Sequence, residues 1–533
     1  MSMRSLRGIA AVGVTAAMLA LAACSGGGDS SAPAPADDVE RVYIEAVSAD
    51  PTSLNPQFAG GPIPLRFGFS VLGTLVELND GYEIMPGLAK SWEFSEDGST
   101  VTLELEEGVL WHDGEPFTSE DVKFNFEEIM PLQTFGKPLS ASIASIDTPD
   151  DTTVVLNLAT QYGPFLAALS QQALVPKHIY EGTDYVTNPA NMAPIGTGPL
   201  MFESFSPGEQ IVLVKNPDWW RGDFEVDRAI YPVMTDPNAR MMALQSGELD
   251  AAVVDPSQQD QVEASDTLEL MLRGALPQMV NAGFNSELPE LSTPELRSLV
   301  FAAIDREAIV DLSLHGLGEA ATTVFPKGMT WAVDDSVDFD ESFERDIDAI
   351  NAGLDAAGYP VGPDGTRFTL DIRYIAALSD VAAAAEVVKS SLQDVGIGAN
   401  LLGTAEPVFM DAVFTQSDFG IMLMRSVAGA DPSIGVVRWL TCNPNRIPVS
   451  NPSGVCDEQL DQAATAALAT LDQDERAAQF RTLQQRAVAS AHWLPLAWTH
   501  GSNYTVSSVR WDGLADAVGQ TNNPPWAHMT WVG

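Results

Sequence analysis

Strand-like and helix-like hydrophobic patterns alternate along most of this chain, and this alternation constrains its fold more than any other feature. Residues 41–47 and 98–106 alternate apolar with polar side chains, as strands do, and Val101, Leu103 and Leu105 fall on one face of the second segment. Alternating strands and helices predict α/β lobes rather than a helical bundle or a β-sandwich. No sequence repeat of fixed period is visible.

Several other segments carry the signals that start and end helices. Thr118-Ser119-Glu120-Asp121 has the form of a capping box and predicts a helix that runs to about Met130. Proline suits a first helical turn, so Ser292-Thr293-Pro294-Glu295 predicts another, with Leu296, Leu299, Val300 and Ala303 on one face. The remaining helices are expected after Asp236-Pro237-Asn238, with Met241, Met242 and Leu244 inward and Gly247 at the end, and at 381–395 (closed by Gly396), 457–471 and 474–488.

The first residues predict export. Arg4 and Arg7 precede an uncharged apolar run over 8–22, and small residues lead to Cys24 in Leu21-Ala22-Ala23-Cys24. These are the marks of a secretory signal peptide, and the run is shorter than the roughly 20 apolar residues of a membrane span. The cysteine resembles that of a bacterial lipobox, which predicts cleavage before Cys24 and lipidation of its thiol. The alternative is an ordinary signal peptide followed by a chance cysteine.

The residues after Cys24 are Gly, Ser, Ala, Pro and Asp up to position 37, with no large apolar side chain. Such a segment cannot bury enough surface to fold, so it is expected to be a flexible tether. We therefore expect a protein outside the cytoplasm, anchored to the outer face of the cell membrane by lipid at Cys24.

Length and charge set further bounds. About 510 residues remain without the signal peptide, which is too long for one ordinary core and predicts two or more lobes. The chain has 27 basic and 73 acidic residues, a formal charge of −46. This balance argues against nucleic acids and anionic lipid surfaces as partners. The acidic residues are scattered, which indicates a solvated acidic surface and does not identify a cationic ligand.

Two cysteines remain besides Cys24. Cys442 and Cys456 form an even pair, and such a pair outside the cytoplasm is usually a disulfide. The alternative is a metal site, but no histidine lies near either thiol in the sequence.

The mature chain resembles the bacterial extracellular solute-binding proteins that serve peptide and nickel importers, known as family 5. The segments that carry the resemblance occur in order over most of the chain. They are Pro86-Gly87-Leu88-Ala89, Ser91-Trp92-Glu93, Ser95-Glu96-Asp97-Gly98, Gly108-Val109, Trp111-His112-Asp113-Gly114, Pro116-Phe117-Thr118, Glu120-Asp121-Val122, Val175-Pro176-Lys177-His178-Ile179-Tyr180, Gly196-Thr197-Gly198-Pro199, Asn216-Pro217-Asp218-Trp219-Trp220, residues 243–250 (ALQSGELD) and residues 303–309 (AIDREAI).

This resemblance implies a two-lobed fold of the periplasmic-binding-protein type II class (cluster C), with an extra subdomain in the first lobe. Two strand crossings act as a hinge, and a ligand closes the cleft between the lobes. It also implies a monomer that delivers a peptide or peptide-like solute to the permease subunits of an ABC importer. The expected divisions are a signal peptide (1–23), a lipidated tether (24–39), lobe I (40–75, 195–285 and 500–533), its extra subdomain (76–194) and lobe II (286–499).

The resemblance also points to one ligand-binding segment. In peptide-binding relatives, an aspartate in a Trp-x-x-Asp-x-x-Asp-Pro pattern pairs with the free amino group of the ligand. This chain has Arg425 at the tryptophan position, Ala428 at the amine-pairing position and Asp431 before the proline. A blocked peptide, or a sugar-like, opine-like or metal-chelate ligand, therefore becomes an alternative to a free-amine peptide. Asp431 is a candidate substitute anchor, or a turn cap; Arg425 is a candidate carboxylate partner, or part of a salt bridge.

Aromatic side chains are the other expected lining of a binding cleft. Our candidates are Trp331, Trp498 and Tyr504, and each has the alternative of packing in the core. His500 is a further candidate ligand contact.

Enzymatic chemistry has little support in the sequence. His112 and Asp113 are adjacent, but Gly114 indicates a turn, and no nucleophile motif accompanies them. Gly196-Thr197-Gly198 is too short for a dinucleotide loop, and the six histidines lack zinc-site spacing. We predict no catalytic residue, metal or cofactor. A secreted hydrolase, or a scaffold or signalling lipoprotein that uses the same fold, remain the alternatives.

Overall fold

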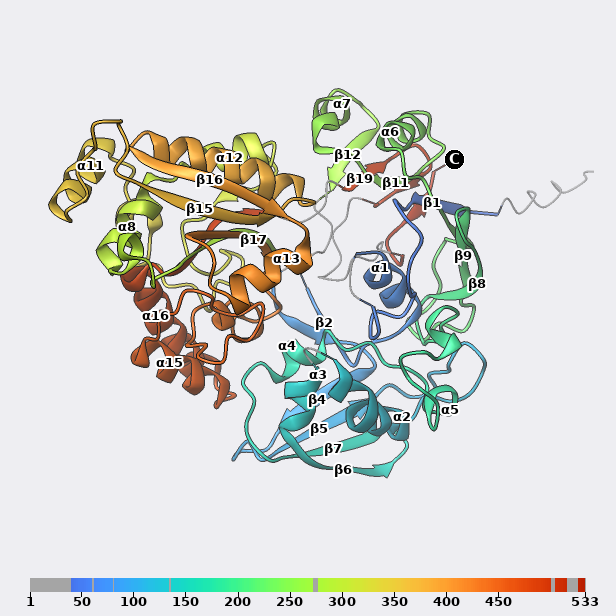
Figure 1. Ribbon diagram of the computed structural model, residues 1–533. Helices are drawn as coiled ribbons and strands as arrows, with labels where there is room; N and C mark the ends of the chain where they lie inside the picture. The colour runs from blue at the N-terminus through green and yellow to red at the C-terminus, as the bar shows by residue number, and fades with distance from the viewer. Residues whose placement is uncertain are drawn as a thin grey trace, which may run out of the picture. The chain divides into compact units, whose positions relative to one another are not determined.

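The computed structural model describes residues 40–59, 62–79, 81–133, 136–271, 277–499, 504–514 and 526–532. The predicted signal peptide, the tether, Cys24 and His500 lie outside these residues. Figure 1 shows mixed α/β architecture built on several separate sheets.

The first large sheet is assembled from pieces that are distant in the sequence. Its central strand β1 pairs in parallel with β10 and β11 on either side, and the remaining pairs are antiparallel. Across the sheet the strands are β12 (Leu268–Met271), β19 (Tyr504–Ser507), β11 (Ala251–Val253), β1 (Val42–Ala46), β10 (Arg228–Pro232), β9 (Gln210–Lys215) and β8 (Leu200–Ser206). Helices α1 (Pro62–Val71), α6 (Pro237–Gln245) and α7 (Gln259–Glu263) accompany it.

A four-stranded antiparallel sheet forms the extra subdomain. Its order is β4 (Ala89–Phe94), β5 (Thr100–Leu105), β7 (Thr153–Leu158) and β6 (Ile143–Asp150). Val101, Leu103 and Leu105 of β5 are buried, as their alternation predicts. The predicted capping box at Thr118 and Asp121 opens helix α2 (Ser119–Phe124), which continues as π and 3₁₀ turns to Leu132. The associated helices are α3 (Gly136–Ala141), α4 (Phe165–Leu169) and α5 (Lys177–Tyr180).

The second large sheet has both pairing directions. Its order is β14 (Glu319–Ala320), β18 (Trp493–Thr499), β13 (Gln278–Phe284), β17 (Ile421–Val427), β15 (Phe368–Ile375) and β16 (Ile397–Thr404). Strand β13 lies between β17 and β18, so residues 278–284 belong with the segments after residue 286. The boundary expected at 285/286 assigns β13 to lobe I, whereas the strands that pair with β13 lie in lobe II.

Helices and turns cover this second sheet, and α12 lies along β15 and β16 (Figure 1). They are α8 (Pro294–Ala303), α9 (Arg306–Ser313), α10 (Phe339–Ser342), α11 (Ile347–Ala356), α12 (Ser379–Gln393), α13 (Glu406–Met410), α14 (Pro432–Gly435), α15 (Glu458–Leu468) and α16 (Gln473–Ser490). The helix signals are confirmed at α8, where Thr293 caps and Pro294 begins the helix, and at α12, where Gly396 follows with positive φ.

One expected core residue lies outside the core. Met241 and Leu244 of α6 are buried, but Met242 is 64% exposed. The buried residues of α6 are Arg240, Met241, Ala243 and Leu244, and at about 100° per residue they share one side of the helix while Met242 lies on the opposite side. The prediction for Met242 was wrong.

Cys442 and Cys456 form a disulfide, with 4.5 Å between their Cα atoms. Hydrogen bonds within the enclosed loop also stabilise its conformation. The Asn451 side chain donates to the carbonyl oxygens of Thr441 and Val455, each at 3.0 Å. Cys442 N–H donates to Asp461 of α15 at 2.8 Å, so the loop is fixed to that helix.

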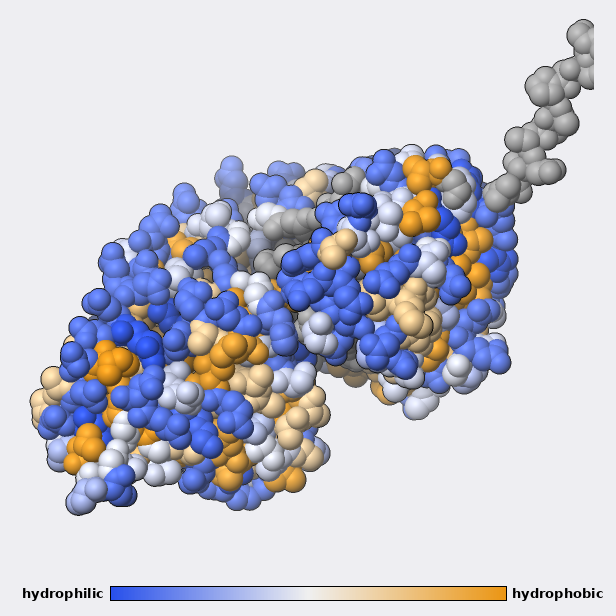
Figure 2. Space-filling model, turned by 90° about the horizontal axis from the view of Figure 1, so that it is seen from above, coloured by the Kyte–Doolittle hydropathy of each residue, from blue (hydrophilic) through white to orange (hydrophobic). Residues whose placement is uncertain are grey.

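Hydrophilic residues cover most of the face seen in Figure 2, with apolar residues in small groups. Among the described residues, no helix combines the length and the apolar character needed to cross a bilayer.

The remaining strand pairs are small. Strand β2 (Val76–Leu78) pairs with β3 (Ile84–Pro86), and β20 (Trp511–Asp512) pairs with β21 (Thr530–Trp531).

Replacing both Cys442 and Cys456 with serine is expected to lower the free energy of unfolding by about 3 kcal/mol, because the bond closes a loop of about 15 residues in the unfolded chain. Urea denaturation measures the difference. Wild-type protein kept in reductant should unfold at the same urea concentration as the double variant. If both unfold at the midpoint of the oxidised wild-type protein, the disulfide does not stabilise the fold.

Candidate ligand-binding site

The segment that follows β17 carries the residues singled out by sequence. Ala428, at the amine-pairing position, is fully buried, and its backbone N–H donates to the carbonyl oxygen of Pro277 at 2.8 Å. Gly435 packs so closely on this turn that a Cβ there would lie 1.6 Å from the Ala428 oxygen. A buried methyl group therefore occupies the position that the sequence resemblance predicted for pairing with a ligand amine.

Asp431 has its charge matched inside the protein. Its carboxylate caps α14 by accepting from Ser433 N–H at 2.9 Å, and it accepts from Arg476 Nη2 at 2.7 Å. The two charged side chains are only 2% and 6% exposed. Arg476 also donates to the Ala467 carbonyl oxygen at 3.0 Å. The cap that was the alternative interpretation of Asp431 is present, together with a buried ion pair that the sequence did not indicate.

Arg425 is held more loosely. Its Nη1 donates to Asp380 Oδ2 at 3.0 Å, and about one third of the arginine side chain is exposed. A guanidinium has five N–H donors, so this single bond leaves donors for a further partner. The salt bridge expected as the alternative is present, and a ligand role for Arg425 stays a prediction.

The aromatic candidates lie in different surroundings. Trp331 is half-buried, with its ring edge-on to Phe480 and under the guanidinium of Arg476, so it belongs to the same cluster as Asp431. Tyr504 is buried in β19 of the other large sheet, with Arg66 over its ring. Trp498 is buried in β18, and its indole N–H has no hydrogen-bond acceptor in the part of the chain that is described.

The strand register separates Arg425 from Trp498. Met279 of β13 pairs with Ser426 on one side and Trp498 on the other, while Val280 pairs with Arg425. Paired residues project from the same face of a sheet and successive residues from opposite faces. Arg425 and Trp498 therefore leave the sheet on opposite faces, although both lie close to strand ends.

The adjacent His112 and Asp113 do not form a catalytic pair. Gly196 N–H donates to His112 Nδ1 at 3.2 Å, and His112 Nε2 donates to the Gly198 carbonyl oxygen at 3.0 Å. Burial lowers the pKa of His112 to about 4, so it is neutral at pH 7. Asp113 contacts His178 instead, at 2.7 Å. Residues 196–198 thus pack against this turn, and no metal-holding group of His, Cys, Asp or Glu occurs among the described residues.

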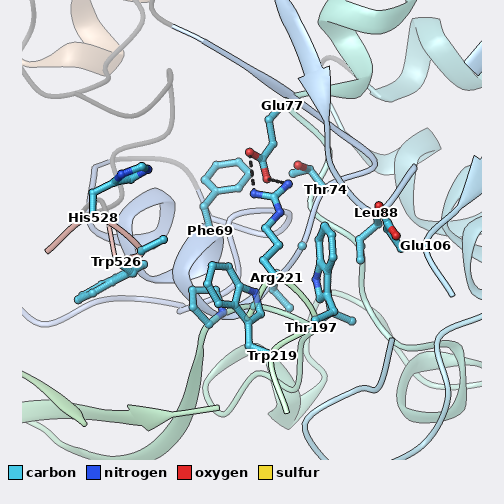
Figure 3. Close-up of a pocket in the computed structure, with 16 residues that line it drawn as sticks. Phe69, Thr74, Glu77, Leu88, Glu106, Thr197, Trp219, Arg221, Trp526 and His528 are labelled. Carbon is cyan, nitrogen blue, oxygen red and sulfur yellow. Dashed lines mark hydrogen bonds and ion pairs between the residues drawn. The ribbon is translucent and has the colours of Figure 1, made fainter. Parts of the chain in front are cut away.

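A cavity of about 550 Å³ was not expected from the sequence (Figure 3). Its walls include Phe69, Glu77, Trp219, Arg221 and Trp526. Figure 3 shows the Arg221 side chain extending across the view to Glu77, with the ring of Phe69 beside it. Two of its lining residues, the adjacent Trp219 and Trp220, lie in one of the segments that carry the family resemblance, and that resemblance did not indicate a cavity.

Three comparisons identify the class of protein. The sequence profile of bacterial extracellular solute-binding proteins, family 5 Middle, matches residues 83–446. A putative ABC transporter peptide-binding protein of Brucella ovis is 29% identical over 497 residues, which cover 88% of this chain and 89% of that protein. The nickel-binding periplasmic protein of Escherichia coli is 23% identical over 446 residues, which cover 80% and 83%.

The fold agrees with these sequence matches. The ABC transporter substrate-binding protein CtaP of Listeria monocytogenes has a TM-score of 0.80 and 23% identity, and the match covers 93% of this chain and 100% of that one. Fold and sequence together define a non-enzymatic substrate-binding protein of an ABC transporter, with the two-lobed α/β fold and extra subdomain that the resemblance implied. The chain belongs to the bacterial extracellular solute-binding proteins of family 5.

Asp431→Asn is expected to lower the free energy of unfolding by about 3–5 kcal/mol, because it leaves the Arg476 charge buried without a counter-charge. Asp394→Asn is the matched control: Asp394 pairs with Arg345 at the surface, and its loss should cost less than about 1 kcal/mol. Urea denaturation compares the two. Equal, small losses would show that Asp431 is not needed for the fold.

Proposed function

We propose that this protein is a lipid-anchored substrate-binding protein of an ABC importer that captures a peptide-like solute between its two lobes by hinge closure. Residues 1–23 are removed on export, Cys24 carries the lipid and residues 24–39 form the tether. The extra subdomain spans 76–194. Lobe I otherwise comprises 40–75, 195–285 and 500–533, and lobe II comprises 286–499, with β13 packed in the lobe II sheet. The tether keeps the protein near the permease and raises its effective concentration there.

The observation that carries the choice of ligand is the buried Ala428. A methyl group cannot pair with an ammonium group, and the nearby Asp431 is already matched by Arg476. An ammonium ligand would have to compete with a buried guanidinium for that carboxylate. This arrangement supports a solute whose amino end is blocked or absent. Relatives include proteins named as peptide-binding and nickel-binding. The alternative class of ligand in this proposal is a sugar, an opine or a metal chelate.

Two donors are proposed to contact the ligand. The Trp498 indole N–H is buried with no acceptor among the residues that the structure describes, and such groups are rare in native proteins unless a ligand or water completes them. Arg425 has donors left after its bond to Asp380 and is proposed to contact a carboxylate or carbonyl at the strand end. Because these two side chains leave opposite faces of the sheet, only a ligand that reaches around the strand ends can contact both.

The remaining candidates have supporting roles in this proposal. Asp431 and Trp331 form one wall through their shared contacts with Arg476. Tyr504 is proposed to contribute from the lobe I sheet, and His500 from the segment between β18 and β19.

Native mass spectrometry of protein purified without denaturation should show a bound small molecule. Once that ligand is in hand, Trp498→Phe should weaken binding about tenfold, because it removes the indole N–H and its buried hydrogen bond while keeping a smaller aromatic ring at the position. Trp439→Phe is the matched control, since the Trp439 N–H is also buried without an acceptor in the described chain. Calorimetric titration measures both. Equal affinities for wild type and Trp498→Phe would remove Trp498 from the site.

Arg425→Ala tests the second donor, with Arg345→Ala as control because Arg345 also forms one partly exposed ion pair. A weaker ligand affinity in Arg425→Ala alone supports contact with the ligand. If no small molecule co-purifies, and neither blocked peptides, sugars, opines nor metal chelates raise the melting temperature, the scaffold or signalling alternative replaces ligand capture.

Lipidation predicts that the chain expressed in a bacterial host partitions into detergent and incorporates a labelled fatty acid. Cys24→Ala should abolish both, because the thiol is the acylated group. Cys442→Ser with Cys456→Ser should retain both, which excludes a general effect of losing cysteine. A labelled Cys24→Ala chain would contradict the anchor.

A further inference from the structure

The loop between β7 and α4 of the extra subdomain contacts the end of α15 in lobe II. Gly163 N–H donates to the Leu468 carbonyl oxygen at 2.7 Å. Leu468 is the last residue of α15, and the last four carbonyl groups of a helix have no partner within it. The extra subdomain therefore supplies a hydrogen bond that this helix of lobe II cannot make by itself.

The approach at Gly163 leaves no room for a side chain. A Cβ there would lie 2.4 Å from the Ala467 carbonyl oxygen, 2.7 Å from that of Thr470 and 2.6 Å from Arg476 Nε. Two of these atoms belong to the backbone at the end of α15, so they cannot turn away as the tip of a flexible side chain can. The φ angle of Gly163 is not positive, so the contact, and not the backbone conformation, requires glycine here.

Apolar contacts accompany this hydrogen bond. Ile434, Leu468 and Leu471 of lobe II pack against the hydrophobic cluster of the extra subdomain. Tyr162 and Phe165, on either side of Gly163, belong to that cluster and are 9% and 0% exposed. The contact thus buries apolar surface of both parts of the molecule, which adds to the hydrogen bond.

The same loop covers the buried ion pair of Asp431 and Arg476. Gly163 lies directly against Arg476 Nε, and the Asp431 and Arg476 side chains are only 2% and 6% exposed. Burial raises the pKa of Tyr162 to about 12, and the negative charge of Asp431 adds to this shift, which agrees with a phenol close to the pair. A loop that lies outside lobe II therefore helps to keep water from the ion pair.

Lobe II can move away from the extra subdomain only by breaking these contacts. On the basis of the hinge closure proposed above, we propose that the loop of Tyr162 and Gly163 is a closure contact, which forms when the cleft shuts over a solute and separates when it opens. Both are positioning residues, because they act by raising the fraction of closed protein, on which the apparent affinity for the solute depends. The extra subdomain thereby takes part in solute capture.

Gly163→Ala is expected to shift the protein toward the open state, because the added methyl group meets the end of α15 only when the two lobes are together. Small-angle X-ray scattering of the purified protein should give a larger radius of gyration for the variant than for wild type. Hydrogen–deuterium exchange should become faster over residues 159–164. The co-purified solute should bind about tenfold more weakly, since less of the protein is closed.

Gly136→Ala is the matched control. A Cβ at Gly136 would lie 2.5 Å from the Met130 carbonyl oxygen, so the clash is similar, but both residues belong to the extra subdomain. This variant should lower the unfolding midpoint and leave the radius of gyration unchanged. Leu471→Ala is a second test that introduces no clash. It removes apolar contact with the extra subdomain and should enlarge the radius of gyration less than Gly163→Ala does.

A larger radius of gyration in Gly163→Ala and Leu471→Ala, with Gly136→Ala matching wild type, supports the closure contact. Equal radii and equal exchange in wild type and Gly163→Ala overturn it, and so does an equally large increase in Gly136→Ala. If Gly163→Ala does not fold, the comparison of Leu471→Ala with wild type decides in the same way. Scattering and exchange need no added ligand, so the closure contact can fail while a solute co-purifies, and it can hold while none does.

Discussion

The buried ion pair of Asp431 and Arg476 fixes the segment that carries the candidate ligand-binding residues. The Arg476 side chain extends from α16 and donates to Asp431, which precedes α14, and to the Ala467 carbonyl oxygen at the end of α15, and it also lies over the ring of Trp331. Neither charge can be removed without leaving the other in a medium of low polarity. The turn after β17, which contains Ala428, is therefore fixed by contacts within the protein itself. If this turn is part of the proposed site, it is ordered without a ligand, and binding costs little side-chain entropy there.

Local signals predicted the elements well. The capping box at Thr118, the alternation in β5 and the proline at the start of α8 all describe short-range physics, and the structure contains each of them. Errors arose where a choice depended on packing. Met242 is as apolar as Met241, and only the position of the sheet under α6 decides which of them is buried. Likewise, no local pattern shows that β13 joins the second sheet, because its partners β17 and β18 are more than a hundred residues away.

For the candidate site, the sequence singled out individual residues but not the partners that they contact. The Asp-Pro pattern located Asp431 and suggested a cap, which is present, but the partner Arg476 comes from a helix distant in the sequence. The register of β13, which sequence alone cannot provide, puts Arg425 and Trp498 on opposite faces.

The seven-stranded sheet joins the two ends of the polypeptide. β1 begins at Val42, and β19, which pairs with β11 and β12, begins only at Tyr504. This sheet cannot close until nearly the whole chain has been synthesised, because its contacts span most of the sequence. The strands of the extra subdomain have no such dependence, whereas the second sheet also needs a late strand, because β18 pairs with β13 and β14. Completing the two large sheets is therefore expected to be among the last steps of folding, while the sheet of the extra subdomain can form on a chain that is still incomplete.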